Sequence, residues 1–189
     1  MFDTGEPATG LELVAALSRL TNEGAQALGA LPIAVFFSPQ GEKWSPAEHA
    51  RHLQKSSAPL IPALRLPAWL LRLLFRRPQR QSRTFVQLRT DYRATLAAGG
   101  TAGRFTPKAE VTPTDPDGRR SEILTHWHLT NVRLAERLGA WREAHLDAAR
   151  LPHPLLGMLT VREMAAFTVY HTAHHLTLVM QRAEPRITP

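Results

Sequence analysis

Apolar residues recur at steps of three and four over much of this 189-residue sequence, which is the spacing that one face of an α-helix requires. The first such segment, over about 9–32, carries Leu13, Leu17, Leu20, Gly24, Leu28 and Leu31. A second segment, over about 119–141, carries Ile123, Trp127, Leu134 and Leu138. A third, over about 160–185, carries Met164, Phe167, His171, His175 and Leu178. No segment shows the sustained alternation that indicates a β-strand. The sequence therefore predicts an all-α protein.

Three predicted helices have a capping box at their start, in which a Ser or Thr side chain and a Glu three residues later each accept the other's backbone amide. The pairs are Thr9 with Glu12, Ser45 with Glu48, and Thr160 with Glu163. The second pair, with Pro46 at the first helical position, predicts a helix from Ser45 to about residue 57 or 60. Glu48 and Glu163 are also candidate general bases, but their capping positions already explain them, so we assign them a structural role.

The segment between the second and third long helices is expected to hold a helical insert, about 66–97, and then a long loop, about 98–118. The insert divides into an amphipathic piece over 66–77 and a second helix over 84–97. A loop of about 20 residues is typical of a functional lid or a mobile segment. An antiparallel four-helix bundle with a long crossover accommodates this order of elements. We expect residues 1–189 to form a single domain.

The composition limits the possible chemistry, because the chain contains no cysteine. A disulfide framework, a zinc ribbon, an iron–sulfur site and a catalytic thiolate are all excluded, and any metal ion must be bound by His, Asp or Glu. The net charge is +7, and twenty of the 23 basic residues are arginine. This balance fits binding to nucleic acid, a membrane or an acidic ligand, although a solvated surface is the favoured interpretation.

Neither a leader nor a membrane span is predicted. The first ten residues lack a basic segment followed by an apolar run, so a secretory signal is not expected and a cytoplasmic location is. The most apolar stretch, 66–75, has about half of the roughly 20 residues that a spanning helix needs, and Arg72 interrupts it.

Two of the nine histidines, His171 and His175, are four residues apart in a predicted helix. This spacing places both imidazoles on the stripe that faces the bundle, where both can reach one metal ion. Two core histidines that bond backbone or water explain the spacing equally well. A firm metal site needs a third ligand, and the second helix offers His49 and His52, which periodicity does not separate.

The other histidines are weaker candidates for this third ligand. His126 and His128 flank Trp127 and are expected at the surface or rim. His145 and His153 lie in a charged or proline-bounded connection and are interpreted as loop histidines. His174 either lines a pocket or, as we favour, packs at a helix boundary. GxSxG, P-loop, GxGxxG and HExxH motifs are absent, so hydrolase elbows, nucleotide cradles and zincin chemistry have no support.

Two stretches, WSPAEHARHL and HPLLGMLTVREMAAFTVYHTAHHLTLVMQR, resemble the DinB/YfiT-like superfamily, which includes the bacillithiol and mycothiol S-transferases. The matching positions are Trp44, Ser45, Pro46, His52, Gly157, Leu159, Glu163, His171 and His175. The resemblance implies a four-helix bundle with a divalent metal site made by His52, His171 and His175, so it selects His52 over His49. Imidazole ligands suit zinc, nickel, iron and copper, and we expect zinc or nickel first. The sequence departs from the family pattern at Met164 and at Thr177 and Leu178, which affects the expected pocket shape.

The resemblance also implies a function. We expect a thiol-dependent S-transferase, in which a low-molecular-weight thiol cosubstrate supplies the sulfur and attacks a small-molecule electrophile. The alternative is a non-catalytic, metal-stabilised stress-response or binding module that contacts anionic partners through its arginines. A homodimer is expected from the resemblance, whereas nucleic acid is a less favoured partner. Alanine at His52, His171 or His175 should remove bound metal, whereas alanine at His49 or His145 should not.

Overall fold

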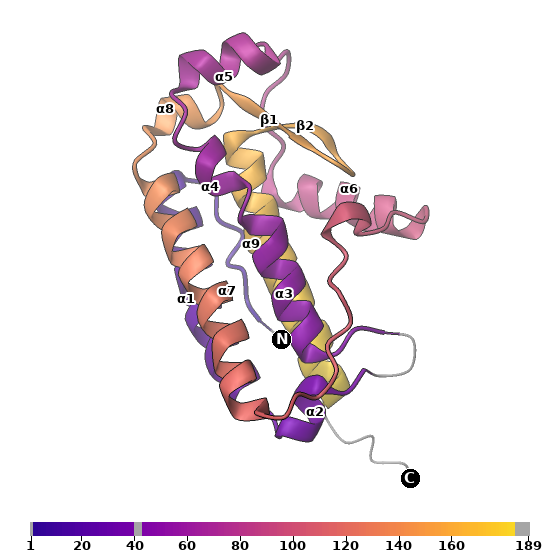
Figure 1. Ribbon diagram of the computed structural model, residues 1–189. Coiled ribbons are helices and arrows are strands. Elements are labelled where there is room, and N and C mark those ends of the chain that lie inside the picture. Colours follow the sequence, from indigo (N-terminus) through magenta and orange to yellow (C-terminus); the bar gives the residue numbers. More distant parts are fainter. Residues whose placement is uncertain (1, 40–42, 184–189) are drawn as a thin grey trace.

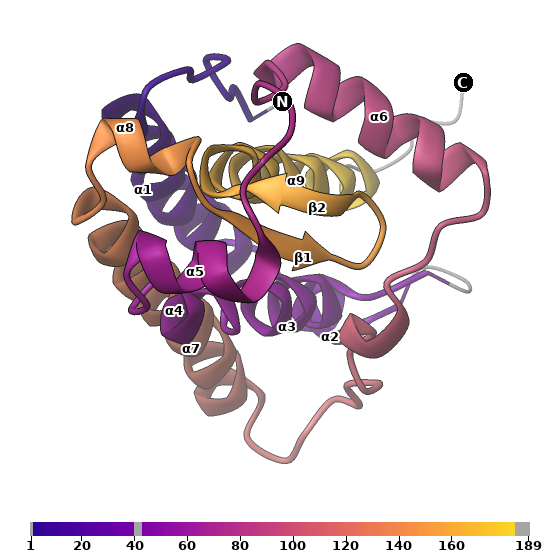
Figure 2. The same ribbon diagram turned by 90° about the horizontal axis from the view of Figure 1, so that it is seen from above.

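The computed structural model describes residues 2–39 and 43–183, and four long helices form its body. These helices are α1 (Gly10–Gly29), α3 (Pro46–Ser57), α7 (Pro116–Gly139) and α9 (Val161–Ala183). Helix α1 packs against α7 and α9, and α3 packs against the same two helices. Figures 1 and 2 show the resulting bundle from the side and from above. The expected four-helix bundle is therefore confirmed.

The helix directions explain the long crossover. In Figure 1, α1 and α9 run downwards, whereas α3 and α7 run upwards. Helix α1 is thus antiparallel to α7, and α3 is antiparallel to α9. Because α3 and its neighbour α7 run in the same direction, a short loop cannot join them. The chain from 58 to 115 makes this connection.

The predicted start signals are present in the structure. Reciprocal capping bonds join Thr9 to Glu12 and Ser45 to Glu48, and the same pair of bonds links Thr160 and Glu163 ahead of α9. Helix α7 begins at Pro116, three residues earlier than expected, because the Asp115 side chain caps it by accepting the Gly118 amide. The predicted end of the last helix, Pro185, lies outside the described residues.

The core follows the predicted apolar stripes. Leu17, Leu20 and Leu134 have no exposed surface, and they belong to the larger of two buried clusters. Trp127 is equally buried in the second cluster, near the end of the bundle where α1 leads into α2 (Ile33–Phe37). Of the stripe predicted for α9, only Leu178 is partly exposed.

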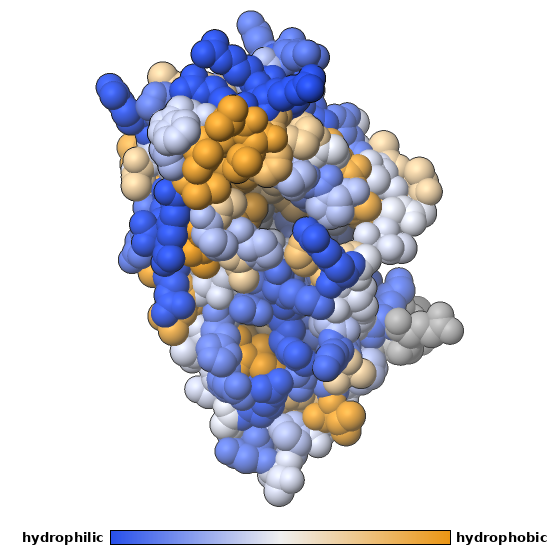
Figure 3. All heavy atoms as spheres, turned by 45° about the horizontal axis from the view of Figure 1, so that its top comes forward, coloured by the Kyte–Doolittle hydropathy of each residue, from blue (hydrophilic) through white to orange (hydrophobic). Residues whose placement is uncertain are grey.

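The crossover contains further helical segments that pack on the bundle. They are α4 (Leu60–Ala63), α5 (Ala68–Phe75), α6 (Phe85–Ala97) and the 3-10 turn η1 (Gly103–Phe105). Helix α6 packs on α9, whereas α5 contacts the hairpin described below. Trp69, Leu73 and Leu74 of α5 remain exposed, and Figure 3 shows an apolar area beside strongly hydrophilic residues over this end of the molecule.

A β-hairpin lies between α8 (Glu143–Leu146) and α9, where the sequence predicted no strand. Strands β1 (Arg150–His153) and β2 (Gly157–Thr160) pair in antiparallel fashion, with Leu151 opposite Leu159. Both leucines are buried, whereas Pro152 is exposed. Each strand has only four residues, and β2 places the apolar Met158 and Leu159 next to each other, so the alternation that indicates a strand is missing.

No single helix within 2–39 and 43–183 is both long and apolar enough to cross a membrane. The consecutive segments Pro46–Ala63 and Ala68–Phe75 pass that test only when joined, and they are bent by 106°.

Candidate metal centre

The structure brings together the three histidines that the resemblance selected. His52 comes from α3, and His171 and His175 come from α9. The possible ligand atoms of these three residues all lie within 4.8 Å of one another, and all three side chains are buried. The Nε2 atom of His171 is 3.1 Å from that of His52 and 3.0 Å from that of His175.

The local sequence explains this convergence. His171 and His175 are four residues apart on α9, so their side chains lie one turn apart on the same face. Helix α3 runs antiparallel to α9, and its capping box fixes where it begins. His52 therefore lies two turns into α3, on the face that packs against the pair.

A hydrogen bond determines which nitrogen of His52 carries the proton. The Nδ1 atom is 3.0 Å from the carbonyl oxygen of Phe105, at the end of η1. A carbonyl oxygen only accepts, so Nδ1–H is the donor and Nε2 of the neutral ring has a free lone pair. The long loop after α6 thus contacts the site directly. Orienting a ligand imidazole through its other nitrogen is typical of metal sites in proteins.

His49 contacts the cluster from its outer side. Its Nδ1 atom is 2.7 Å from Nδ1 of His175, while its own Nε2 is buried without a hydrogen-bond partner. One of the two Nδ1 atoms must donate to the other. If His175 donates, its Nε2 keeps a lone pair that faces His171. His49 is therefore a neighbour of the predicted ligands and is not among the three histidines whose ligand atoms converge.

Burial keeps the clustered imidazoles neutral. Desolvation lowers the pKa of His171 and His175 well below the usual value for histidine, and the neighbouring imidazoles lower it further. Desolvation also lowers the pKa of His52, although the bond to the Phe105 carbonyl opposes this shift. A neutral imidazole is the form that binds a metal ion.

The donor set fits a divalent metal ion. One Nε2 atom, that of His171, lies at hydrogen-bond distance from two others, and a single ring nitrogen has either one proton or one lone pair to offer. An ion that accepted three lone pairs would satisfy all three nitrogens at once. Imidazole ligands suit zinc, nickel, copper and iron.

The cluster borders a cavity of about 260 Å³. Its walls are formed largely by apolar and aromatic side chains, including Leu60, Leu96, Met164 and Phe167, together with Tyr92. Burial raises the pKa of Tyr92 to about 12, so its hydroxyl stays protonated. Among the described residues, no carboxylate lines this cavity.

Three further aromatic residues lie near the site, namely Trp44, His174 and His153. Trp44 covers the cluster, with its ring centroid 4.8 Å from that of His52 and 6.1 Å from that of His175. His174 lines the cavity, so the favoured packing role at a helix boundary does not describe it fully. The motif around Trp44 pointed to this residue, whereas for His174 the sequence offered a pocket-lining role only as the less favoured of two interpretations.

The interpretation of His153, the third of these residues, as a loop histidine was wrong. It ends β1, lines the cavity and packs against Phe167 with 4.3 Å between ring centroids. Its Nδ1 accepts the backbone amides of Leu155 and Leu156. Desolvation and the charge of Arg83 lower its pKa to about 4. The hairpin, which the sequence did not predict, places this residue.

The remaining histidines do not line the cavity. His126 is exposed and His128 is half-buried, as expected for the outer side of α7. His145 lies in α8.

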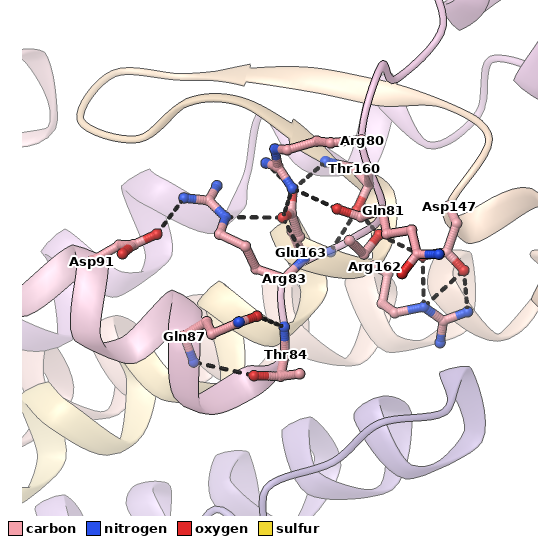
Figure 4. A network of polar contacts seen from close by, with 11 residues as sticks. Arg80, Gln81, Arg83, Thr84, Gln87, Asp91, Asp147, Thr160, Arg162 and Glu163 are labelled. Atoms are coloured by element: carbon pink, nitrogen blue, oxygen red, sulfur yellow. Dashed lines mark hydrogen bonds and ion pairs between the residues drawn. The ribbon is translucent and has the colours of Figure 1, made fainter.

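Glu163 is fully buried, and its surroundings support a structural role. Its carboxylate accepts two bonds from the Arg80 guanidinium, two from Arg83 and one from the Thr160 amide, as Figure 4 shows in close-up. Burial alone would raise its pKa, but these donors lower it to about 2. Two arginines of the insert, Arg80 and Arg83, thus form intramolecular ion pairs that hold the crossover against the start of α9.

Glu48 has a similar structural role at the start of α3. One carboxylate oxygen accepts the Ser45 amide, and the other accepts the Glu110 amide from the long loop. The contact holds this part of the loop against α3. Glu48 and Glu163 are both absent from the cavity lining, so neither is placed to act as a general base there.

Comparison with known proteins gives one fold-level match and one family match. The structure is similar to that of YfiT from Bacillus subtilis, described as a probable metal-dependent hydrolase with an unusual four-helix bundle topology. The TM-score is 0.58 at 13% identity, and the match covers 92% of this chain and 86% of that one. A search of curated protein sequences gives no match. A family model described as the DinB superfamily matches residues 16–179, so this chain belongs to the DinB superfamily.

Proposed function

We propose that this protein is a metal-dependent enzyme that binds a divalent ion, zinc or nickel, through His52, His171 and His175. The observation that carries the proposal is the convergence of three buried, neutral imidazoles at the wall of a cavity. Three nitrogen ligands without a fourth protein ligand are typical of catalytic zinc, whereas structural zinc is usually enclosed by four. The description of YfiT as a probable metal-dependent hydrolase supports the metal-dependent part.

The residues of the chain prepare the site for catalysis. The Phe105 carbonyl orients His52, and apolar side chains around Phe167 form much of the cavity wall. The protonated hydroxyl of Tyr92 is a hydrogen-bond donor beside the cavity. When bound, the ion supplies positive charge that favours the deprotonated form of a small ligand such as water or a thiol.

We infer that the nucleophile is a thiol rather than water. No carboxylate lines the described part of the cavity, so a water nucleophile would depend on the metal ion or on a cavity histidine, His153 or His174, for its deprotonation. A thiol has a pKa of about 8.5 and loses its proton far more readily. The sulfur then attacks an electrophilic carbon, a carbon–sulfur bond forms, the leaving group departs with its electron pair, and the thiol proton passes to solvent. Because the chain has no cysteine, a low-molecular-weight cosubstrate must supply the sulfur.

Elemental analysis of purified variants tests the metal site. We expect about one ion per chain in the wild type and a loss of most of it in His52→Ala, His171→Ala and His175→Ala. His145→Ala is the matched control, because His145 lies in α8 and does not line the cavity. Equal metal content in all five proteins would refute the assignment of ligands.

A turnover assay tests the reaction. The metal-loaded wild type and His171→Ala are incubated with a chlorodinitrobenzene electrophile and a panel of small thiols, and the thioether product is measured. We expect turnover by the wild type that requires both metal and thiol. Metal binding without turnover by any thiol would favour the alternative, in which the ion only links α3 to α9. Product formation from water alone would favour a hydrolase.

We also propose that the protein is a homodimer. Light scattering after size exclusion measures the mass of the particle and tests this part of the proposal.

A further inference from the structure

Helix α5 presents an unusually apolar face to solvent. Its side chains Trp69, Leu73 and Leu74 are 62%, 72% and 56% exposed, respectively. Ala68 and Leu71, on the opposite side, are buried against the body of the protein. An eight-residue helix thus carries three of the eight large apolar side chains that are exposed in the described part of the chain. Clustered exposure of this kind marks an interaction surface.

The same region is strongly basic. Residues 49–90 contain nine lysines and arginines and no aspartate or glutamate. Arg72 lies within α5, and Arg76 and Arg77 follow its last residue. Arg80 and Arg83 are already paired with Glu163, but Arg76 and Arg77 are exposed and form no ion pair with any described residue. An apolar patch therefore has positive charge beside it that the protein itself does not neutralise.

We propose that α5, together with Arg72, Arg76 and Arg77, binds the surface of an anionic lipid bilayer. Trp and Leu side chains on a short helix enter the boundary between headgroups and acyl chains, and adjacent guanidinium groups bind lipid phosphates. A helix of eight residues is about 12 Å long, which is too short to span a bilayer of about 30 Å. Helix α5 would therefore lie along the boundary between the lipid headgroups and the acyl chains, without crossing the bilayer.

The charge argues against two other occupants of this face. A two-fold contact between copies places the same patch on both partners, so it would bring unneutralised arginines of one copy next to those of the other. A nucleic acid would bind the arginines, but its phosphate backbone would leave Trp69, Leu73 and Leu74 without apolar partners. An anionic bilayer satisfies both the apolar and the charged groups.

The proposed bilayer-binding face lies close to the part of the molecule that contains the cavity. Helix α5 packs against β1, and Pro152 and His153 of β1 line the cavity. The proposal does not depend on the enzymatic function, because none of the α5 residues lines the cavity.

Co-sedimentation of the full-length protein with vesicles tests the proposal. One set of vesicles contains phosphatidylcholine alone, and the other contains about one third phosphatidylglycerol. We expect the wild type to bind only the anionic vesicles, and more weakly as salt increases. Leu73→Ser combined with Leu74→Ser, and separately Arg76→Glu combined with Arg77→Glu, should each weaken binding by about tenfold or more.

Matched control variants lie on the exposed side of α7. Leu129→Ser with Val132→Ser also removes two exposed apolar side chains, although these are 42% and 37% exposed, less than Leu73 and Leu74, and Arg133→Glu with Arg137→Glu changes the net charge by the same amount. Both should bind within about twofold of the wild type. Helical circular dichroism and metal content verify that all variants are folded.

Several outcomes would overturn the proposal. They are no binding by the wild type, equal binding to neutral vesicles, or an equal loss of binding in the α7 controls. A wild-type dimer that dissociates in Leu73→Ser with Leu74→Ser would instead identify this face as a contact between copies.

Discussion

The bond between His49 and His175 matters because a histidine can offer a lone pair from only one nitrogen when the other carries the proton. With Nδ1 of His49 2.7 Å away, His175 can place its proton on Nδ1 and keep Nε2 free. The sequence alone predicted that His49 could be removed without loss of metal. The structure predicts instead that His49 orients a ligand.

The substitution His49→Phe tests this role, because phenylalanine fills the space but cannot accept a hydrogen bond. We expect about a 10- to 100-fold weaker affinity for zinc, measured by competition with a chromophoric chelator. His145→Phe is the control and should bind as the wild type does. Equal affinity in His49→Phe and the wild type would show that the bond to His175 does not orient the ligand.

His153 should contribute to the pH dependence of stability. Its folded-state pKa is about 4, whereas an unfolded chain has the ordinary value near 6.5. The folded state therefore binds fewer protons between these values, so stability rises with pH from about 4 to 6.5 and is lost as the pH falls through this window. Because His153 is partly exposed to solvent, we expect its titration to change the free energy of unfolding by only about 1–2 kcal/mol.

Denaturant unfolding of the wild type and His153→Asn across this pH range measures the effect. Asparagine retains an acceptor for the Leu155 and Leu156 amides but does not titrate. The difference in unfolding free energy between the two proteins should change by the stated amount between pH 6.5 and 4 and stay constant outside it. A difference that does not vary with pH would contradict the assigned pKa.

The ligand residues were easier to predict than their surroundings for a physical reason. His171 and His175 share one helix, so their spacing alone places them on one face. His52 required the family resemblance, because His49 lies one turn away on a similar face. His153 reaches the site only through the hairpin, and no local pattern in the sequence predicts that contact.

Among the elements, the helices of the bundle pack closely around Gly24 of α1. A Cβ atom there would lie 2.6 Å from Cδ1 of Leu176 and 2.7 Å from Cη2 of Trp127. Both side chains are almost completely buried, so neither can move away easily. Gly24 therefore allows α1 to pack closely against α7 and α9 at the same time.

Gly24→Ala should lower the free energy of unfolding by about 1–3 kcal/mol despite the better helix propensity of alanine. Gly29→Ala is the control in the same helix, because its Cβ would lie 3.8 Å from Leu124, an ordinary contact distance. That variant should be unchanged or more stable by up to about 1 kcal/mol. Urea unfolding of both variants measures the contrast, and equal stability would argue against the close packing at Gly24.

Helix starts were predicted well because a capping box is local, whereas the hairpin depends on distant contacts. Strand β1 contains Pro152, which cannot donate to a ladder, and the two strands are joined by only three residues. Leu151 and Leu159 are buried in the main core cluster, so packing on the bundle stabilises the hairpin. Neither the pairing nor this burial leaves a periodic signal in the sequence.

The proposed metal site joins two helices that are far apart in the sequence. His52 and His171 are separated by 119 positions, and the long crossover lies between them. Glu163 fastens that crossover to α9 through Arg80 and Arg83, while Phe105 attaches the loop to His52. Bundle, crossover and site therefore depend on one another, and an ion that binds only the folded form should stabilise all three.

Thermal unfolding with and without zinc tests this coupling. At a free zinc concentration of about 100 times the Kd, an ion that binds only the folded state raises the free energy of unfolding by about 2.7 kcal/mol. For a chain of this length, that gain raises the Tm by about 5–10 °C. His171→Ala removes one of the three converging imidazoles, so its Tm should respond much less to zinc, whatever its own stability. An equal rise in both proteins would mean that zinc acts elsewhere, since a site built from these three histidines cannot survive the loss of one without a large fall in affinity.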